Sequence, residues 1–161
     1  IYSLCSHDGR LYDAGAFCEI FDTLDNSNGD KSITRRPGPV MSLCSHEGVL
    51  YDGGFYKKIF DTLNDPYGRN ACVTRKNNVH SLCSHNGILY DAGNYAQVYE
   101  TLNDYPLGTR FGSINCLCSH AGTLYDAGLY NNMFNTLTNE PITEEYERVT
   151  AICSHKGVHF K

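Results

Sequence analysis

The chain has 161 residues, 41% hydrophobic and 19% charged, which is typical of a folded domain. No apolar run approaches the roughly 18 residues of a membrane helix, so we expect no membrane span. The net charge of −5 disfavours duplex nucleic acid as a partner, because binding through charge requires a basic surface. There is no N-terminal signal peptide pattern, and the chain begins at Ile1, so we expect a processed or excised chain.

In chain order, the dominant feature is a repeat that is marked by Cys-Ser-His. The motif recurs five times, with cysteine spacings of 39, 39, 35 and 35 residues. A search for repeats comes first because a fixed period of this length predicts a repeat architecture. The units are 1–39, 40–78, 79–113, 114–148 and a partial unit 149–161, and we expect them to form a single domain, 1–161.

Each unit divides into short strands. The first unit predicts strands over Ile1–His7, Leu11–Ala14, Phe17–Leu24 and Ile33–Arg35. Gly9 and its counterparts, each with the residue before it, form a two-residue signal for a tight hairpin turn between the first two strands. A loop rich in Asn, Asp and Gly follows the third strand, as over 26–30. Counterparts of the fourth strand are expected at Val73–Arg75, Gly108–Arg110 and Ile142–Glu144.

Four antiparallel strands in 35–39 residues correspond to one blade of a β-propeller. The predicted fold is therefore all-β, a propeller of about four and a half repeats. The layout resembles the superfamily that includes WD-repeat and kelch propellers, although the chain contains no Trp and hence no Trp-Asp signature. That resemblance implies an architecture rather than a function.

The chain both starts and stops at a first strand, which leaves ring closure open. It can form a five-bladed ring with a half-size last blade, belong to a larger propeller, or close by association of chains. Self-association is therefore one expected partner interaction.

A Ser/His/Asp/Thr set recurs in the repeats and is similar to the network within WD-repeat blades. We expect it to hold each blade together, because repetition suits structure better than catalysis. The sixteen residues are Ser6, His7, Asp13, Thr23, Ser45, His46, Asp52, Thr62, Ser84, His85, Asp91, Thr101, Ser119, His120, Asp126 and Thr136.

The same repetition argues against an enzyme. A Ser/His/Asp triad needs one defined geometry and an oxyanion hole, and no Gly-x-Ser-x-Gly elbow is present. Cys-x-His pairs such as Cys5 and His7 have zinc-ligand chemistry, but one site would need two pairs from different blades. We therefore predict no enzymatic activity, no cofactor and no bound metal.

The eight cysteines are interpreted as reduced thiols. Five occupy one repeat position on different blades, where separations are too large for bridges. Cys18 with Cys72 is the pairing that an oxidising compartment would allow. Reduced thiols and the missing signal peptide predict an intracellular location.

The favoured function is a rigid scaffold that presents variable loops to protein partners. Arg35, Arg36, Lys57 and Lys58 belong to a candidate basic surface for an anionic partner. Glu144, Glu145 and Glu147 form an acidic cluster that could meet this surface on another chain.

The alternative is a lectin-like propeller with one carbohydrate site per blade. Aromatic rings stack on sugars, and Tyr56, Tyr95 and Tyr130 recur at one repeat position, where the first unit has Phe17. The competing interpretation of these rings is packing between blades.

Overall fold

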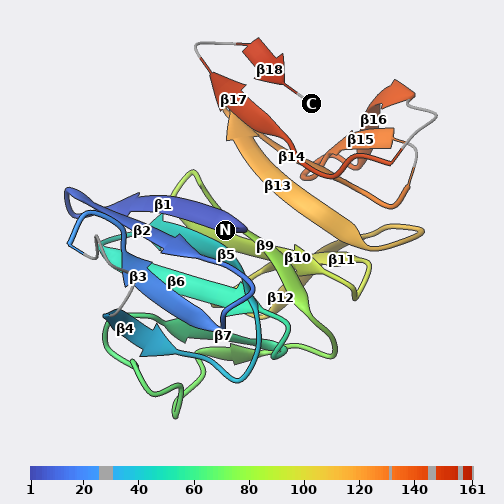
Figure 1. The fold of residues 1–161 in the computed structure, drawn as a ribbon. Helices are drawn as coiled ribbons and strands as arrows, with labels where there is room; N and C mark the ends of the chain where they lie inside the picture. Colours follow the sequence, from blue (N-terminus) through green and yellow to red (C-terminus); the bar gives the residue numbers. More distant parts are fainter. Residues whose placement is uncertain (26–30, 131, 145–147, 156–157, 161) are drawn as a thin grey trace. The chain divides into compact units, whose positions relative to one another are not determined.

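The computed structural model describes residues 1–25, 31–130, 132–144, 148–155 and 158–160. Within them, all regular structure is β: four four-stranded antiparallel sheets and one two-stranded sheet, with no helix (Figure 1). The described part accordingly has no helix of the length and apolarity that a membrane crossing demands. The predicted loop over 26–30, and Glu145 and Glu147 of the acidic cluster, lie outside the described residues.

The chain divides into two compact units, Ile1–Val79 and His80–Lys161. The boundary falls after the first residue of the third repeat. Each unit is described below by itself.

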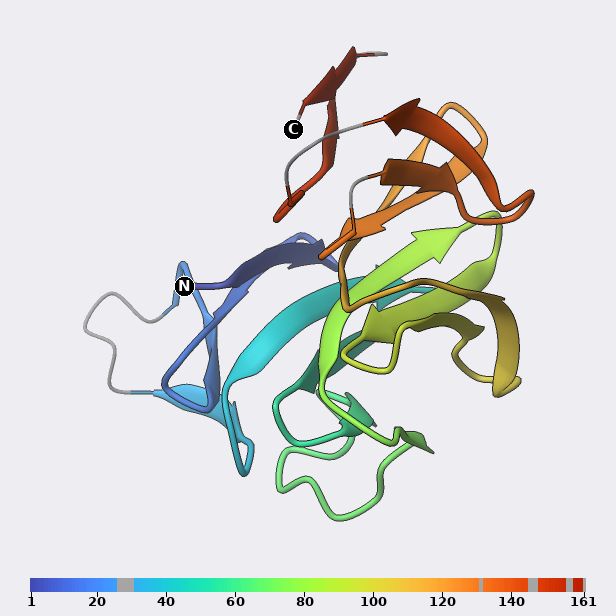
Figure 2. The ribbon, with the colours of Figure 1, turned by 90° about the vertical axis from the view of Figure 1, so that its right-hand side faces the viewer.

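The first unit contains two sheets, each in sequence order and each visibly twisted (Figures 1 and 2). The first sheet consists of β1 (Ser3–His7), β2 (Arg10–Ala14), β3 (Glu19–Asp22) and β4 (Ser32–Arg35). The second consists of β5 (Val40–His46), β6 (Val49–Gly54), β7 (Lys58–Asp61) and β8 (Val73–Thr74).

The third and fourth repeats form the next two sheets. One consists of β9 (Val79–His85), β10 (Ile88–Gly93), β11 (Gln97–Glu100) and β12 (Tyr105–Thr109). The other consists of β13 (Ile114–His120), β14 (Thr123–Gly128), β15 (Asn132–Asn135) and β16 (Glu140–Glu144). The partial repeat pairs β17 (Cys153–His155) with β18 (Val158–Phe160). The prediction of a repeated all-β fold is confirmed.

The hairpin between the first two strands of each sheet has the predicted two-residue turn. Asp8 and Gly9 have φ of 47° and 75°, and Glu47 with Gly48, Asn86 with Gly87 and Ala121 with Gly122 repeat the pattern. Positive φ at both central residues matches the twist of the flanking strands.

The third strand is shorter than predicted, Glu19–Asp22 instead of Phe17–Leu24. Cys18 has φ of 63°, a left-handed turn conformation that delays the start of the strand. At the other end, the Asp22 carboxylate accepts the N–H groups of Leu24 and Asp25, both at 3.3 Å, and this local turn ends the strand.

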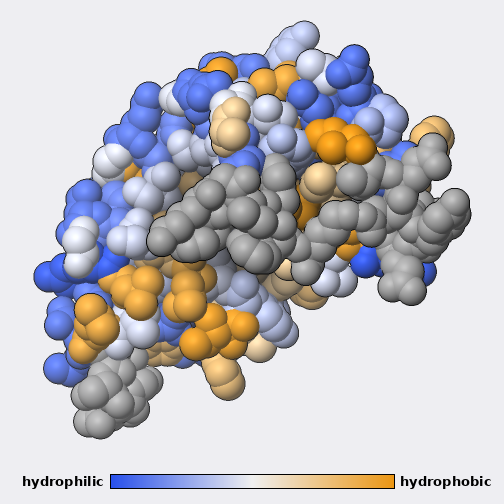
Figure 3. Space-filling view, turned by 90° about the horizontal axis from the view of Figure 1, so that it is seen from above, coloured by the Kyte–Doolittle hydropathy of each residue, from blue (hydrophilic) through white to orange (hydrophobic). Residues whose placement is uncertain are grey.

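Each unit has a core built from adjacent sheets. In the first unit, Tyr12 and Ile20 of the first sheet pack with Val40, Leu43 and Leu50 of the second. In the second unit, the cluster is Tyr90, Ala92, Val98, Ile114, Leu117, Leu124 and Tyr130. Hydrophobic residues also reach the face shown in Figure 3. The exposed large side chains include Phe17, Tyr67 and Phe111. The sheets are therefore held together by apolar contact within each unit.

A glycine at the end of the second strand lets the preceding linker pass very close. A Cβ on Gly54 would lie 2.1 Å from the carbonyl oxygen of Pro39, and one on Gly128 would lie 2.0 Å from that of Ser113. Those same oxygens accept the N–H groups of Phe55 and Leu129. This hydrogen bond between the linker and the sheet therefore requires glycine at the end of the second strand.

We predict that Gly54→Ala destabilises the protein by about 3 kcal/mol or more, because backbone must move to admit the methyl group. Gly48→Ala is the matched control, since its Cβ meets nothing within 4 Å and only the left-handed φ of 75° is strained. That strain costs about 1–2 kcal/mol. Urea denaturation of both variants measures the difference, and an equal loss for the two would refute the close-approach explanation.

Candidate functional site

One set of polar contacts joins the first strands of successive sheets. The Nδ1 atom of His7 lies 2.8 Å from the Ser45 hydroxyl of the next repeat. His85 with Ser119 at 2.8 Å, and His120 with Ser154 at 2.6 Å, repeat the contact in the second unit. The predicted Ser and His of the network thus pair between repeats, whereas the sequence placed them within one blade.

The Ser–His pair in the first unit has a third polar neighbour. The other ring nitrogen of His7 lies 3.5 Å from the carboxylate of exposed Asp8, which is too long for a hydrogen bond. The residue after the histidine is Glu47, Asn86 or Ala121 in the following repeats. An acid is therefore not a constant part of this arrangement, and the pairs fit a structural role better than a triad.

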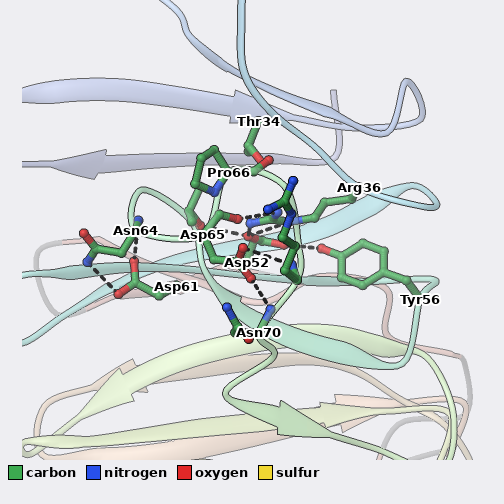
Figure 4. Close-up of polar contacts among 11 residues, drawn as sticks. Thr34, Arg36, Asp52, Tyr56, Asp61, Asn64, Asp65, Pro66 and Asn70 are labelled. Carbon is green, nitrogen blue, oxygen red and sulfur yellow. Dashed lines mark hydrogen bonds and ion pairs between the residues drawn. The ribbon is translucent and has the colours of Figure 1, made fainter.

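A second set of contacts surrounds the aspartate of the second strand. Asp52 on β6 is fully buried, and Arg36, from the segment after β4, reaches it with Nε at 2.9 Å and Nη2 at 2.6 Å. Tyr56 and Thr62 donate their hydroxyls to the same carboxylate at 2.5 and 3.0 Å. Figure 4 shows Arg36 and Tyr56 converging on Asp52. We call this set of Arg, Asp, Tyr and Thr the arginine clamp.

The clamp recurs in the second unit. Arg110 reaches both oxygens of Asp126, at 2.8 and 2.6 Å, while Tyr130 and Thr136 donate at 2.5 and 2.9 Å. In both clamps the guanidinium also stacks on an aromatic ring of the third strand. Its carbon lies 4.4 Å from the Phe60 centroid in one clamp and 4.3 Å from the Phe134 centroid in the other.

The backbone of each clamp arginine is hydrogen-bonded to its own repeat. The backbone N–H of Arg36 donates to the Cys18 carbonyl, and that of Arg110 donates to the Ala96 carbonyl, both at 2.7 Å. Cys18 and Ala96 are the left-handed residues of the turn before the third strand. The arginine is thus fixed by one repeat while its side chain enters the next.

The pKa values of Arg36 and Tyr56 are shifted in the clamp. Burial lowers the pKa of Arg36, but the hydrogen bond and negative charge of Asp52 outweigh it, so the net shift is upward. Burial and the charge of Asp52 raise the pKa of Tyr56 well above its ordinary value. The arginine therefore stays charged and the tyrosine stays a hydrogen-bond donor.

The other network residues occupy equivalent places. Thr23 donates to Asp13 at 2.8 Å in the first sheet. In the third, Tyr95 donates to the fully buried Asp91, and Thr101 is buried. Of the remaining members, His46 is buried, Ser6 is exposed and Ser84 is partly exposed.

The predicted binding residues separate into two groups. Tyr56, Tyr95 and Tyr130 direct their hydroxyls to the aspartates of the second strands, and Arg36 is only 3% exposed, so these four face the interior. Arg36 cannot belong to a basic surface. Arg35, Lys57 and Lys58 are exposed and stay available.

Sequence reasoning missed the structural role of the clamp arginine. The signal was present: Arg36, Arg75 and Arg110 each stand eight residues before the motif cysteine of the next repeat. Their variable neighbours made them look like surface charges. Arg75 is likewise buried.

The thiols are poor nucleophiles where they are buried. Burial raises the pKa of Cys83 and of Cys116 to about 12, so both are protonated at neutral pH. All eight cysteines, Cys18 and Cys72 included, are free thiols. The described residues contain no group of three His, Cys, Asp or Glu side chains that could hold a metal ion.

Comparison with known proteins supports the fold alone. No protein-family model matches the chain. No curated protein matches it either. Among solved structures, the computationally designed Ika8 protein is similar, with a TM-score of 0.62 and 13% identity. The match covers 99% of this chain and 54% of that one, so the chain spans about half the length of its neighbour.

We predict that Arg36→Met destabilises the protein by about 3–5 kcal/mol, because it leaves the buried Asp52 carboxylate unpaired. Combining it with Asp52→Leu should recover part of that loss. The control is Arg10→Met, which removes a 2.8 Å ion pair to Asp22 from an arginine that is 59% exposed. Denaturation should show a much smaller change for this control, and equal losses would contradict the importance of burial.

We also predict that Cys83 and Cys116 react last with iodoacetamide at pH 9. A thiol of pKa about 12 is only about a thousandth ionised at that pH. Exposed Cys153 is the internal reference. Peptide mapping after timed labelling gives the order, and early modification of Cys116 in the folded protein would contradict it.

Proposed function

We propose that the four-stranded repeats are blades of a β-propeller and that the chain is a non-enzymatic module for binding protein partners. The repeated sheets and the likeness to Ika8 support the architecture. The roles found for the Ser/His and Asp/Thr sets support a non-enzymatic function. The Ser–His contacts join neighbouring repeats, and the Asp–Thr hydrogen bonds lie within a repeat. Binding is then expected where the repeats differ, in the loops between their third and fourth strands.

The observation that carries the proposal is the ordered loop 64–70 between β7 and β8. The Asp65 carboxylate accepts the N–H groups of Arg69 and Asn70 at 2.9 and 2.7 Å. Those hydrogen bonds, led by the one from Arg69, lower the pKa of Asp65 despite its partial desolvation. The loop is thus folded on its own aspartate.

The clamp arginine Arg36 is also hydrogen-bonded to this loop. Arg36 donates through Nη1 to the Asp65 carbonyl at 2.8 Å, and Thr34 donates its hydroxyl to the Pro66 carbonyl (Figure 4). One buried side chain therefore both joins two sheets and sets the position of a surface loop.

The loop presents a tyrosine and an arginine to solvent. Tyr67 is 77% exposed, and the guanidinium carbon of Arg69 lies 5.3 Å from its ring centroid. Tyr and Arg are enriched among residues that dominate protein-binding energy. Because the loop is already ordered, it would lose little conformational entropy when a partner binds it.

The corresponding connection in the third repeat differs in length and shape. Asp104 is left-handed with φ of 52°, and exposed Tyr105 follows directly as the first residue of β12. This difference fits a scaffold in which individual loops carry specificity while the sheets stay constant.

We predict that the double change Tyr67→Ser and Arg69→Ser weakens partner binding by about 2 kcal/mol or more, roughly thirtyfold in Kd. Thermal stability should stay close to wild type, because both side chains are on the surface. Partners are identified by cross-linking in the source cells, purified and titrated by calorimetry.

The control is Phe111→Ser, which changes a fully exposed aromatic ring in the other unit. It should leave the same binding unchanged. A partner that binds the double variant with wild-type affinity would remove the loop from the proposal.

A further inference from the structure

The second unit has a cavity of about 330 Å³ beside the clamp of the fourth repeat. Three aromatic rings, one leucine and one amide line it: Phe111, Tyr130, Phe134, Leu129 and Asn132. Asn132 and Phe134 belong to β15 (Figure 1) and share one face of that strand, because side chains alternate along a strand. The volume falls in the range of about 300–1,000 Å³ that small-molecule sites have.

The clamp holds one wall of this pocket in place. Tyr130 donates its hydroxyl to Asp126 at 2.5 Å, and the guanidinium carbon of Arg110 lies 4.3 Å from the centroid of the Phe134 ring. The centroids of the Tyr130 and Phe134 rings are 5.8 Å apart, with 58° between their planes. A wall that is already fixed loses little conformational entropy when a ligand binds, which favours affinity.

The opposite side of the pocket is apolar and open to solvent. The Phe111 side chain is fully exposed, and Leu129 is 45% exposed. The residues at the position of Phe111 in the two preceding repeats are Pro37 and Lys76, so the ring is not a constant part of the repeat. Exposed apolar surface is unfavourable in water, and a ligand with an apolar face would remove that cost by covering it.

Asn132 supplies the polar group of the pocket. Within the part of the chain that the structure describes, its side-chain amide has no hydrogen-bond partner. The corresponding residues are Glu19, Lys58 and Gln97, so a short neutral side chain takes the place of a charged or longer one. An amide has a carbonyl acceptor and N–H donors, and it can therefore bond to a hydroxyl group in both directions.

The pocket lining carries no charge, and this property restricts the ligand. None of the five lining residues is ionisable to an ion at neutral pH, and the charges of Arg110 and Asp126 behind the wall are paired with each other. A charged ligand would lose hydration without gaining a partner. The pocket therefore suits a neutral ligand with an apolar face for the rings and a hydroxyl group for the amide.

We propose that this pocket binds the pyranose ring of a neutral carbohydrate. The C–H groups on one side of the sugar would lie on Phe111 and Leu129, and a ring hydroxyl would bond to the Asn132 amide. An apolar side chain from a protein partner fits less well, because it would cover the amide and leave it unpaired.

This site differs from the predicted arrangement of one carbohydrate site per blade. That arrangement relied on Tyr56, Tyr95 and Tyr130, whose hydroxyls are bonded to buried aspartates. The proposed site instead depends on Phe111 and Asn132, which are specific to one place in the chain.

The test uses the full chain and three probes: methyl β-D-galactopyranoside, methyl β-D-glucopyranoside and methyl α-D-mannopyranoside. Saturation-transfer-difference NMR should detect binding of at least one at millimolar concentration. The C–H protons on one face of the sugar should receive more magnetisation than the O-methyl protons, because that face lies on the rings. Absence of binding for all three glycosides, or uniform transfer to all their protons, would overturn the inference.

A pair of leucines provides matched variants. Leu129→Ser removes an apolar contact from the pocket and should weaken glycoside binding about fivefold or more. Leu137→Ser is the control, because Leu137 is 46% exposed, belongs to the same unit and does not line the pocket. It should leave the glycoside signal unchanged, and equal losses for the two variants would place the binding elsewhere.

The variant Asn132→Leu separates a sugar from an apolar side chain of a protein. It should weaken glycoside binding about fivefold or more, because a hydroxyl of the sugar loses its partner. N-acetylphenylalaninamide represents the apolar side chain, and its binding should not weaken in this variant. If the wild-type protein binds this compound more tightly than every glycoside, the occupant is a protein side chain and the inference is wrong.

The result is distinguishable from that for the loop 64–70. The variant with Tyr67→Ser and Arg69→Ser should keep the glycoside signal. Phe111→Ser, which should leave partner binding at the loop unchanged, should lose the glycoside signal. Failure of one proposal therefore leaves the other standing.

Discussion

The structure depends on a buried ion pair that joins one repeat to the next. An arginine and an aspartate without exposure to water carry a large desolvation penalty, which is offset only when every polar atom is satisfied. Here the aspartate receives the guanidinium, a tyrosine hydroxyl and a threonine hydroxyl, and the guanidinium lies on an aromatic ring. A neighbouring sheet in another position would leave these charges unpaired, so the clamp specifies how successive sheets meet within each unit.

This constraint connects the interior to the surface. Arg36 completes the clamp and also donates to the loop that presents Tyr67. The position of the proposed binding loop thus depends on the same side chain that joins two sheets.

Much of the fold was predictable because the repeat carries it. The strand order, the two-residue turns at Gly9 and its counterparts, and four strands per unit all follow from local pattern and turn chemistry. The bounds of the third strand were not predictable, since they depend on the left-handed Cys18 and on the side chain of Asp22. The residues of the Ser/His/Asp/Thr network were predicted from the sequence, but the pairing of Ser with His between repeats was not.

By itself, the sequence determined the all-β class, the repeat and which residues recur, because these are properties of local spacing and residue type. Only the tertiary structure decided that Arg36 and Arg110 are interior ligands of an aspartate 16 residues away. It also decided that the tyrosines beside them face inward. The physical reason is that a charge is stabilised in the interior only by partners from another sheet, and residue type alone does not reveal which sheet supplies them.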